Sequence, residues 1–432
     1  MLLKILLGTG GHVEPKDFEL CMKHFQCEFS SNGIINKINR NYPIPYSVFQ
    51  RKIKIIGIFG GKSLMNKFDN FTDLAIPNAE KWFQIYKWKI KLNDASWCQC
   101  ETVKEKAGTN VESYPNLVVE CHVEGEDKKE EEGGGEKPSS RVSFEIANEN
   151  EQLAVRFDDL LICNESPMAM ELVNLTACTL VSDDYIYRIL EWIEYHRLIG
   201  FQRFIIQIDS PYFDSYKEFL RPYIDRHPNL VVLVPFYFET QRRPEDMARQ
   251  DCLFRSKTLS KFTAIFDVDE FFQLSPNLLR KNQTLIDFLE MKFAQNNDAV
   301  GILGLSFLYN NCFNKTVDEF SLAIESYQIR TVEPYENERQ KTIYLTEKIF
   351  YVNPHTPRSY DVAVIQADPY NELSVNHYRW PTMPKFYESL KVRDLSLSIL
   401  FSNKIKANLR ANGYILKDFE TNAINLNNKI DC

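Results

Sequence analysis

Strand-like and helix-like segments alternate from residue 172 to residue 266, and this alternation limits the fold more than any other feature. Apolar, β-prone runs are joined by short links to segments whose apolar residues recur at helical spacing. Such a pattern predicts right-handed crossovers and a mostly parallel α/β sheet, Rossmann-like, with helices on both faces. The predicted strands are Leu172–Leu180, Phe204–Ile208, Leu230–Pro235 and Phe262–Phe266, and the predicted helices are Asp184–Ile199, Tyr212–Asp225 and Glu245–Ser260.

The fourth of these strands ends abruptly in three acids, Asp267, Asp269 and Glu270. A buried strand carries carboxylates at its carboxyl end only where the chain meets water or a cation. Ligands of open α/β sheets bind beyond the carboxyl ends of the strands, and Mg²⁺ or Mn²⁺ is usually held by one or two carboxylates plus substrate phosphates. Asp267 and Asp269 therefore predict a metal–diphosphate site. The alternative is that these acids are turn residues closing a strand.

No phosphate-binding loop accompanies the predicted sheet. The chain contains neither a G-x-G-x-x-G fingerprint nor a G-x-x-x-x-G-K-[ST] loop, and these are the common backbone cradles for phosphate. A metal must then take that role, which favours the functional interpretation of the two aspartates.

The predicted α/β domain spans residues 169–412. Beyond the acids, we expect a helix at Thr284–Asn296, strands at Val300–Leu308 and Lys341–Val352, and helical structure from Lys385 to about Asn412. Residues 413–432 form a polar tail.

The first third of the chain has a different pattern of segments, which predicts a smaller, sandwich-like β-rich domain over residues 41–168. Short β segments occur there, and residues 1–40 show no sustained period. The Gly- and charge-rich stretch 124–140 cannot support a core and is predicted to be a disordered loop. The predicted β segments are Lys52–Phe59, Leu117–His122, Arg141–Ile146 and Leu160–Cys163.

Charge and cysteine content narrow the possible partners and compartments. A formal net charge of −8 argues against a nucleic-acid binder, which needs a surplus of Lys and Arg. Six of the ten cysteines fall in the first 165 residues and match no zinc motif, so they suit a lumenal domain with disulfides. Five sequons indicate the same compartment: Asn70, Asn164, Asn174, Asn282 and Asn314.

No stretch approaches the 18 or more apolar residues of a membrane span. Met1–Leu7 is apolar but too short, and it is not a convincing signal peptide. Two explanations stay open at this point: an incomplete amino terminus, or a cytosolic protein.

Several later residues are candidates for the same site, each with a plainer alternative. His377 could complete the shell of a transition metal, and Arg379 could bind phosphate oxygens. Lys341 could neutralise a departing diphosphate. Asp318 and Glu319 follow a polar strand end and are candidates for a catalytic base. A structural histidine and solvated surface charges are the commoner explanations.

Four motifs, in order, resemble those of glycosyltransferase family 92. They are EWIEYHRLIG at Glu191–Gly200, DCLFR at Asp251–Arg255, FDVDEF at Phe266–Phe271 and HYR at His377–Arg379. The resemblance covers roughly residues 172–400.

The resemblance implies a GT-A fold and an inverting β-galactosyltransferase that uses UDP-galactose, with Mn²⁺ (or Mg²⁺), on a glycan acceptor. Asp267 and Asp269 resemble the family's metal- and donor-binding pair, and His377 resembles a late third metal ligand. Lys341 and Arg379 match positions near the donor diphosphate. Golgi residence as a single-pass type II membrane protein is also implied, although no anchor is visible and Asp209–Pro211 matches no family pattern.

Two other classes compete with a transferase. One is a glycan-binding relative that has kept the fold without catalysis. The other is a phosphatase of the haloacid dehalogenase type, with Asp267 as nucleophile. That signature calls for Thr or Val four residues after the first Asp, and Phe271 stands there.

Overall fold

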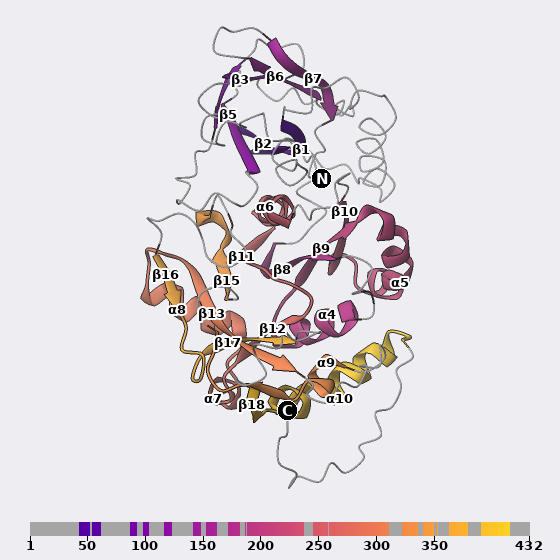
Figure 1. Cartoon of the computed structure of the whole chain (residues 1–432), viewed down its shortest axis with the longest axis vertical. Coiled ribbons are helices and arrows are strands. Elements are labelled where there is room, and N and C mark those ends of the chain that lie inside the picture. The colour runs from indigo at the N-terminus through magenta and orange to yellow at the C-terminus, as the bar shows by residue number, and fades with distance from the viewer. Residues whose placement is uncertain are drawn as a thin grey trace, which may run out of the picture. The chain divides into compact units, whose positions relative to one another are not determined.

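The computed structural model describes seven strands between positions 43 and 161 and most of residues 172–414. Within the second stretch it leaves out 182–185, 187, 237–244, 258, 311–321, 336–339, 350–351, 353–362 and 379–389. The chain divides into two compact units, Met1–Glu171 with Pro235–Arg255, and Leu172–Val234 with Ser256–Cys432. Figure 1 labels the elements of both.

The described strands of the first unit form one antiparallel sheet in the order β1-β2-β5-β4-β3-β6-β7. The sandwich-like domain expected over residues 41–168 stays a prediction. Helix α6 (Glu245–Ser256) belongs largely to the same unit. The strands are β1 (Pro43–Arg51), β2 (Lys54–Gly61), β3 (Lys87–Leu92), β4 (Cys98–Thr102), β5 (Asn116–His122), β6 (Arg141–Ala147) and β7 (Leu153–Leu161).

The second unit is built on a mixed sheet, so the predicted α/β class is confirmed. Its main path runs β10-β9-β8-β11-β15-β13-β14-β18, and β12, β16 and β17 join it beside β13. Strands β9, β8 and β11 are parallel, whereas β15 is antiparallel to both β11 and β13. The alternation predicts a mostly parallel sheet, but the sheet is parallel only in part, as at β9, β8 and β11. The strands are β8 (Val173–Val181), β9 (Arg203–Asp209), β10 (Val231–Phe236), β11 (Ser260–Ile265), β12 (Glu270–Leu274), β13 (Ala299–Asn310), β14 (Ile329–Thr331), β15 (Lys341–Leu345), β16 (Ala363–Gln366), β17 (Leu373–Tyr378) and β18 (Leu390–Arg393).

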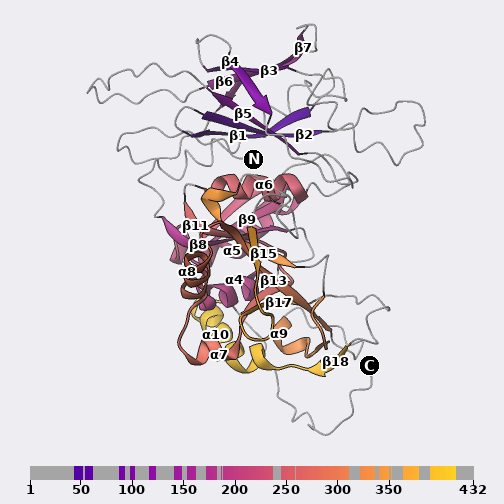
Figure 2. The ribbon, with the colours of Figure 1, turned by 90° about the vertical axis from the view of Figure 1, so that its left-hand side faces the viewer.

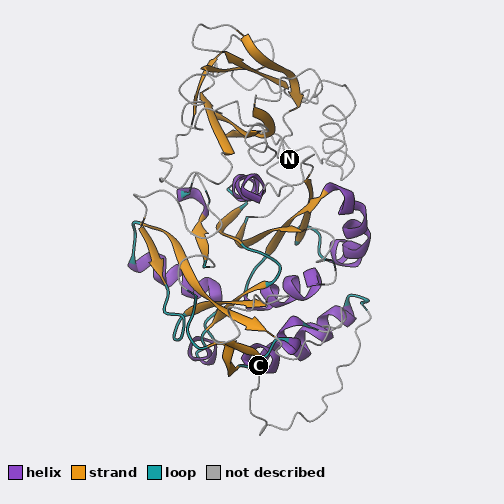
Figure 3. Cartoon of the chain, viewed as in Figure 1, coloured by secondary structure: helices purple, strands orange, loops and turns teal. Residues whose placement is uncertain are grey.

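Helices flank this sheet (Figure 3). Helix α4 ends at Gly200, whose φ of 120° suits a residue without a Cβ. Helix α8 begins with a capping box between Thr284 and Asp287. None of the helices in the described part of the chain is long and apolar enough to span a membrane. The helices are α4 (Arg188–Ile199), α5 (Phe213–Arg226), α7 (Pro276–Arg280), α8 (Leu285–Gln295), α9 (Ala323–Ser326) and α10 (Ser396–Ala411).

Helix α10 lies along α4 and α9 (Figure 2). The Asn408 amide donates to the Glu194 carboxylate at 2.9 Å, and Lys406 pairs with Glu325 at 2.6 Å. Both acids are buried or nearly so, and each therefore has a polar partner on α10.

Three predicted boundaries are wrong for identifiable reasons. Helix α6 stops at Ser256 because Ser260 already begins β11. The strand predicted at Lys341–Val352 ends at Leu345, where a 3₁₀ turn at Thr346–Lys348 begins and the Thr346 hydroxyl bonds to Thr263 at 2.9 Å. Residues 390–393, predicted to be helical, pair with β14 as a strand, and α10 starts only at Ser396.

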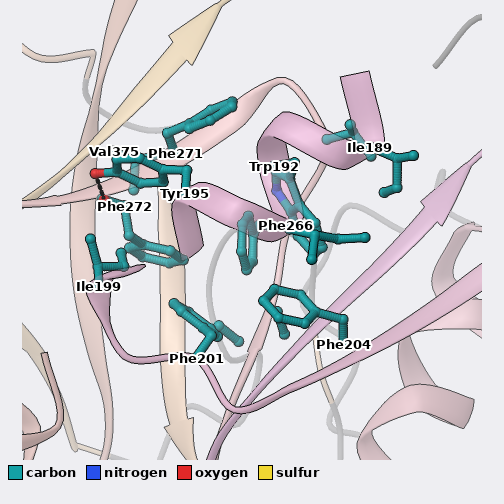
Figure 4. Close-up of a cluster of buried hydrophobic side chains, with 14 of the residues drawn as sticks. Ile189, Trp192, Tyr195, Ile199, Phe201, Phe204, Phe266, Phe271, Phe272 and Val375 are labelled. Carbon is teal, nitrogen blue, oxygen red and sulfur yellow. Dashed lines mark hydrogen bonds between the residues drawn. The ribbon is translucent and has the colours of Figure 1, made fainter. Parts of the chain in front are cut away.

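Aromatic side chains from α4, β9, the end of β11 and β12 form the core beneath the acids (Figure 4). Trp192 lies against Phe204 and Phe266, with ring centroids 5.5 and 4.9 Å away. Such tilted and edge-on pairs add to the burial of large apolar surfaces. This packing fixes α4 against the strand end that carries Asp267.

Two polar residues of α4 hold the backbone of β12. The Tyr195 hydroxyl donates to the Phe272 carbonyl at 2.6 Å, and the Phe272 N–H donates to His196 Nε2 at 3.3 Å. Burial lowers the pKa of His196 to about 3, so its ring is neutral and can accept that bond. The EYH motif of this helix therefore positions β12.

Candidate functional site

The three acids form a tight turn between β11 and β12. The Glu270 N–H donates to the Asp267 carbonyl at 3.0 Å, and the Asp267 N–H donates to Glu270 Oε2 at 2.9 Å. The Asp267 side chain remains 51% exposed, while those of Asp269 and Glu270 are 15% and 1% exposed. A buried carboxylate thus closes the turn and leaves Asp267 open to a ligand.

Lys341 supplies a buried positive charge to this turn. It begins β15, which lies between β11 and β13. Its Nζ lies 3.1 Å from Asp267 Oδ2 and 3.0 Å from Glu270 Oε2, and its side chain is 1% exposed. An ammonium this deep requires acidic partners, and here it has two.

His377 reaches the acids from β17, 108 residues beyond Asp269 in the chain. It lies directly opposite Glu270 in the β12–β17 pairing. Its Nε2 is 3.3 Å from Asp269 Oδ2, and its Nδ1 is 3.6 Å from Glu270 Oε1. Long-range strand pairing therefore brings this histidine to the turn.

The charges of this cluster are mutually dependent. Burial lowers the pKa of His377, but Asp269 and Glu270 outweigh that effect, so the pKa of His377 is raised overall. Burial raises the pKa of Glu270, and Lys341 opposes this by stabilising the carboxylate. Lys341, and His377 when it is protonated, provide the positive charge that keeps several acids together in a small volume.

The structure brings together four of the residues predicted from the sequence: Asp267, Asp269, Lys341 and His377. The predicted Arg379, Asp318 and Glu319 lie outside the described residues. Glu270 was noted only as the third acid of the run, yet it contacts both Lys341 and His377. Its place at the first residue of β12, after a buried strand, was the available signal.

Arg188, at the start of α4, is a second cation near the acids that the sequence did not single out. Its Nη2 donates to the Tyr327 hydroxyl at 3.0 Å, and its guanidinium lies 5.5 Å from the centre of that ring. Burial lowers the pKa of Arg188, but Tyr327, Glu191 and Asp269 raise it overall. Asp269 is thus near enough for Arg188 to stabilise negative charge at the turn.

The side chains of Asp267, Asp269 and His377 carry donor atoms of the types that bind divalent cations. Carboxylate oxygens suit Mg²⁺ and Mn²⁺, and Mn²⁺ also accepts an imidazole nitrogen. Across the described ranges, no three His, Cys, Asp or Glu side chains already form a complete metal-binding group. The described side chains alone therefore do not make up a metal site, and a cation at this turn would take further ligands from substrate phosphates.

Comparison with known proteins decides the family. The model of glycosyltransferase family 92 matches residues 174–412, more than half of the chain. The chain belongs to this family. It is therefore a glycosyltransferase by family, and the mixed α/β sheet of the second unit agrees with the expected GT-A, Rossmann-like fold class. No curated protein sequence matches the chain.

The solved structures that match the chain include three of low identity and low TM-score. A 4-diphosphocytidyl-2C-methyl-D-erythritol synthase from Anaerococcus prevotii is 12% identical, with a TM-score of 0.25, over 54% of this chain and 99% of its own. HddC from Yersinia pseudotuberculosis is 11% identical, with a TM-score of 0.26, over 50% and 98%. The bifunctional glycosyltransferase WbbM is 12% identical, with a TM-score of 0.20, over 31% and 23%.

Proposed function

We propose that this family 92 glycosyltransferase transfers a hexose, galactose, from UDP-galactose to a glycan acceptor with inversion at the anomeric carbon. The observation that carries the proposal is the half-exposed Asp267 beside the paired Asp269 and His377, at the carboxyl end of a buried strand. The family match leaves no support for the phosphatase alternative.

In this proposal Asp267, Asp269 and His377 hold Mn²⁺ or Mg²⁺. The cation would neutralise negative charge that develops on the leaving diphosphate. Lys341 holds Asp267 and Glu270 in place, and its charge lies where it also favours a bound diphosphate. Arg379, next in the chain after β17, is proposed to bind the same phosphate oxygens.

Inversion requires one carboxylate to take the proton of the acceptor hydroxyl, on the side opposite the leaving group. Asp318 and Glu319 remain the proposed candidates for this base. The buried Glu270 is a poorer candidate because it already contacts Lys341, His377 and the Asp267 N–H.

We also propose that the protein works in the Golgi lumen, held by a type II membrane anchor. Both Cys178 and Cys252 are disulfide-bonded, and disulfides persist in oxidising compartments. Two sequon asparagines, Asn174 and Asn282, are exposed and could accept a glycan.

The direct test is UDP release from UDP-galactose by purified protein, with Mn²⁺ and with a chelator. We expect release that the chelator suppresses. Asp269→Asn should lower the rate at least a hundredfold, because a ligand and a partner of His377 are both weakened, with little change in Tm. Asp298→Asn, at an exposed acid beside β13, is the matched control and should keep the wild-type rate.

An Asp269→Asn variant as active as wild type would contradict the assignment of the metal site. If wild-type protein releases UDP from no UDP-sugar but binds glycans, the non-catalytic alternative is supported instead.

A further inference from the structure

The side chain of Asn310, at the end of β13, is buried without using its polar atoms. It is 1% exposed, and within the described part of the chain neither its Oδ1 nor its Nδ2 has a hydrogen-bond partner. It is the one described side chain in which two polar atoms are unpartnered in this way. Buried polar atoms are almost always hydrogen-bonded, so this amide calls for an explanation.

Strand register places Asn310 on the same side of the sheet as the acids. In the parallel pairing of β13 with β17, Leu308 lies opposite His377. Side chains alternate along a strand, so Asn310 shares the face of Leu308 and hence of His377. Lys341 belongs to this face as well, since it pairs with Gly304, an even number of residues before Asn310. From ordinary strand spacing, the Cα atoms of Asn310 and His377 are roughly 8 Å apart.

A carboxamide whose oxygen and nitrogen both lack hydrogen-bond partners suits a particular kind of ligand. It donates from nitrogen and accepts at oxygen, so it pairs well with groups that do both. Phosphate oxygens only accept, and a bound diphosphate would leave Oδ1 unpaired. Neighbouring hydroxyls of a sugar ring donate and accept, and a hexose attached to a diphosphate held at Asp267 and Asp269 spans the distance to Asn310.

We propose that Asn310 binds hydroxyl groups of the donor hexose and contributes to the choice of sugar. This assignment rests on the proposed function. The free protein carries an unsatisfied amide, and the sugar satisfies it on binding. Such a site rejects a ligand that lacks the matching hydroxyls, because the buried amide would again be unpaired.

The test compares Asn310→Leu with Asn376→Leu. Leucine has the branched shape of asparagine but no polar atoms, and its extra volume is the same in both variants. Asn376, on the adjacent strand β17, is equally buried, but its Nδ2 donates to Gln273 at 2.7 Å. We expect Asn310→Leu to lower the Tm of the free protein less than Asn376→Leu does, because the extra volume is the same and no hydrogen bond is lost at Asn310.

Binding is then measured by calorimetry with Mn²⁺, for UDP and for whichever of UDP-galactose, UDP-glucose and UDP-N-acetylglucosamine the wild-type protein binds most tightly. Asn310→Leu should weaken binding of the UDP-sugar about five- to tenfold, the equivalent of one or two neutral hydrogen bonds. Its affinity for UDP, which has no hexose, should stay within about twofold of wild type.

Three results would overturn the assignment. A fall in Tm for Asn310→Leu as large as that for Asn376→Leu would mean that the amide is paired within the fold. Equal weakening of UDP and UDP-sugar would mean that Asn310 contacts the base or the diphosphate. Unchanged binding of both would mean that it contacts neither. Wild-type protein that binds none of these nucleotides would instead contradict the proposed function itself.

Discussion

At the scale of single residues, the acid turn depends on one buried lysine. Lys341 is the cation that Asp267 and Glu270 share, and Glu270 is almost fully buried. Removing one partner of a buried ion pair leaves an uncompensated charge, whereas removing both can cost little. The pair is therefore expected to behave as a unit.

Lys341→Met should lower the free energy of unfolding by about 3–5 kcal/mol, because Glu270 then loses its main stabilising charge. Glu270→Gln should also destabilise the protein. The double variant should lose clearly less than the sum of the two, as a double-mutant cycle from urea unfolding would show. Strictly additive losses would contradict a direct coupling between these residues.

A second residue-scale feature is the carboxylate of Glu191. It accepts hydrogen bonds from the backbone N–H groups of Ala323 and Ile324, at 2.6 and 3.0 Å, and so caps the short helix α9 from α4. Burial raises the pKa of Glu191 to about 7, although these two donors and Arg188 act in the opposite direction. The folded protein thus keeps a proton that the unfolded chain gives up near pH 4.5.

The sign of the pH dependence follows from this difference. Below about pH 4.5 both states hold the proton, and as pH rises towards 7 only the folded state does, so stability falls over this window. The loss attributable to Glu191 is roughly 3 kcal/mol, from about 2.5 pKa units. In urea unfolding from pH 5 to pH 8, Glu191→Gln should flatten the slope, and Glu290→Gln, at an exposed acid, should not. An unchanged slope in Glu191→Gln would contradict the raised pKa.

At the scale of elements, the sequence was sufficient for structure that depends on local pattern. The alternation of strands and helices from β8 to β11 was predictable, because each segment has its own periodicity and is followed by turn residues such as Gly200. The aspartates at the end of β11 were predictable for the same reason. Their chemistry follows from three or four neighbouring residues.

Features that depend on distant pairing could not be predicted in the same way. His377 was identified by residue type and family resemblance, but its contact with Asp269 results from the pairing of β12 with β17. The local pattern of the segment that forms β18 predicts a helix, but its pairing with β14 overrides that pattern. Asn310 belongs to the polar strand end noted in the sequence, but its burial could not be predicted, since an asparagine at a strand end looks like a turn residue.

At the scale of the whole molecule, the disulfide-bonded cysteines affect the stability of the fold and therefore the compartment in which the protein can work. Cys178 and Cys252 are buried and disulfide-bonded, and a disulfide typically stabilises a fold by about 2–4 kcal/mol. A protein that relies on them should perform poorly under reducing conditions.

Reduction should therefore lower the Tm by several degrees. Unfolding with and without a phosphine reductant measures this, and Cys178→Ser should reproduce part of the shift without any reductant. Mass spectrometry after alkylation of unreduced, denatured protein gives an independent check. Alkylation of both cysteines there would show that neither is bridged and would remove the support that they give to a lumenal location.

Two hydrogen bonds join α4 to the strand that begins with Glu270: the Tyr195 hydroxyl donates to the Phe272 carbonyl, and His196 accepts from the Phe272 N–H. Because of these bonds and the aromatic packing, we expect a displacement of the helix to displace the acids as well. A substitution deep in this helix could then misalign the donor by a fraction of an ångström and slow catalysis while every chemical group of the site is still present.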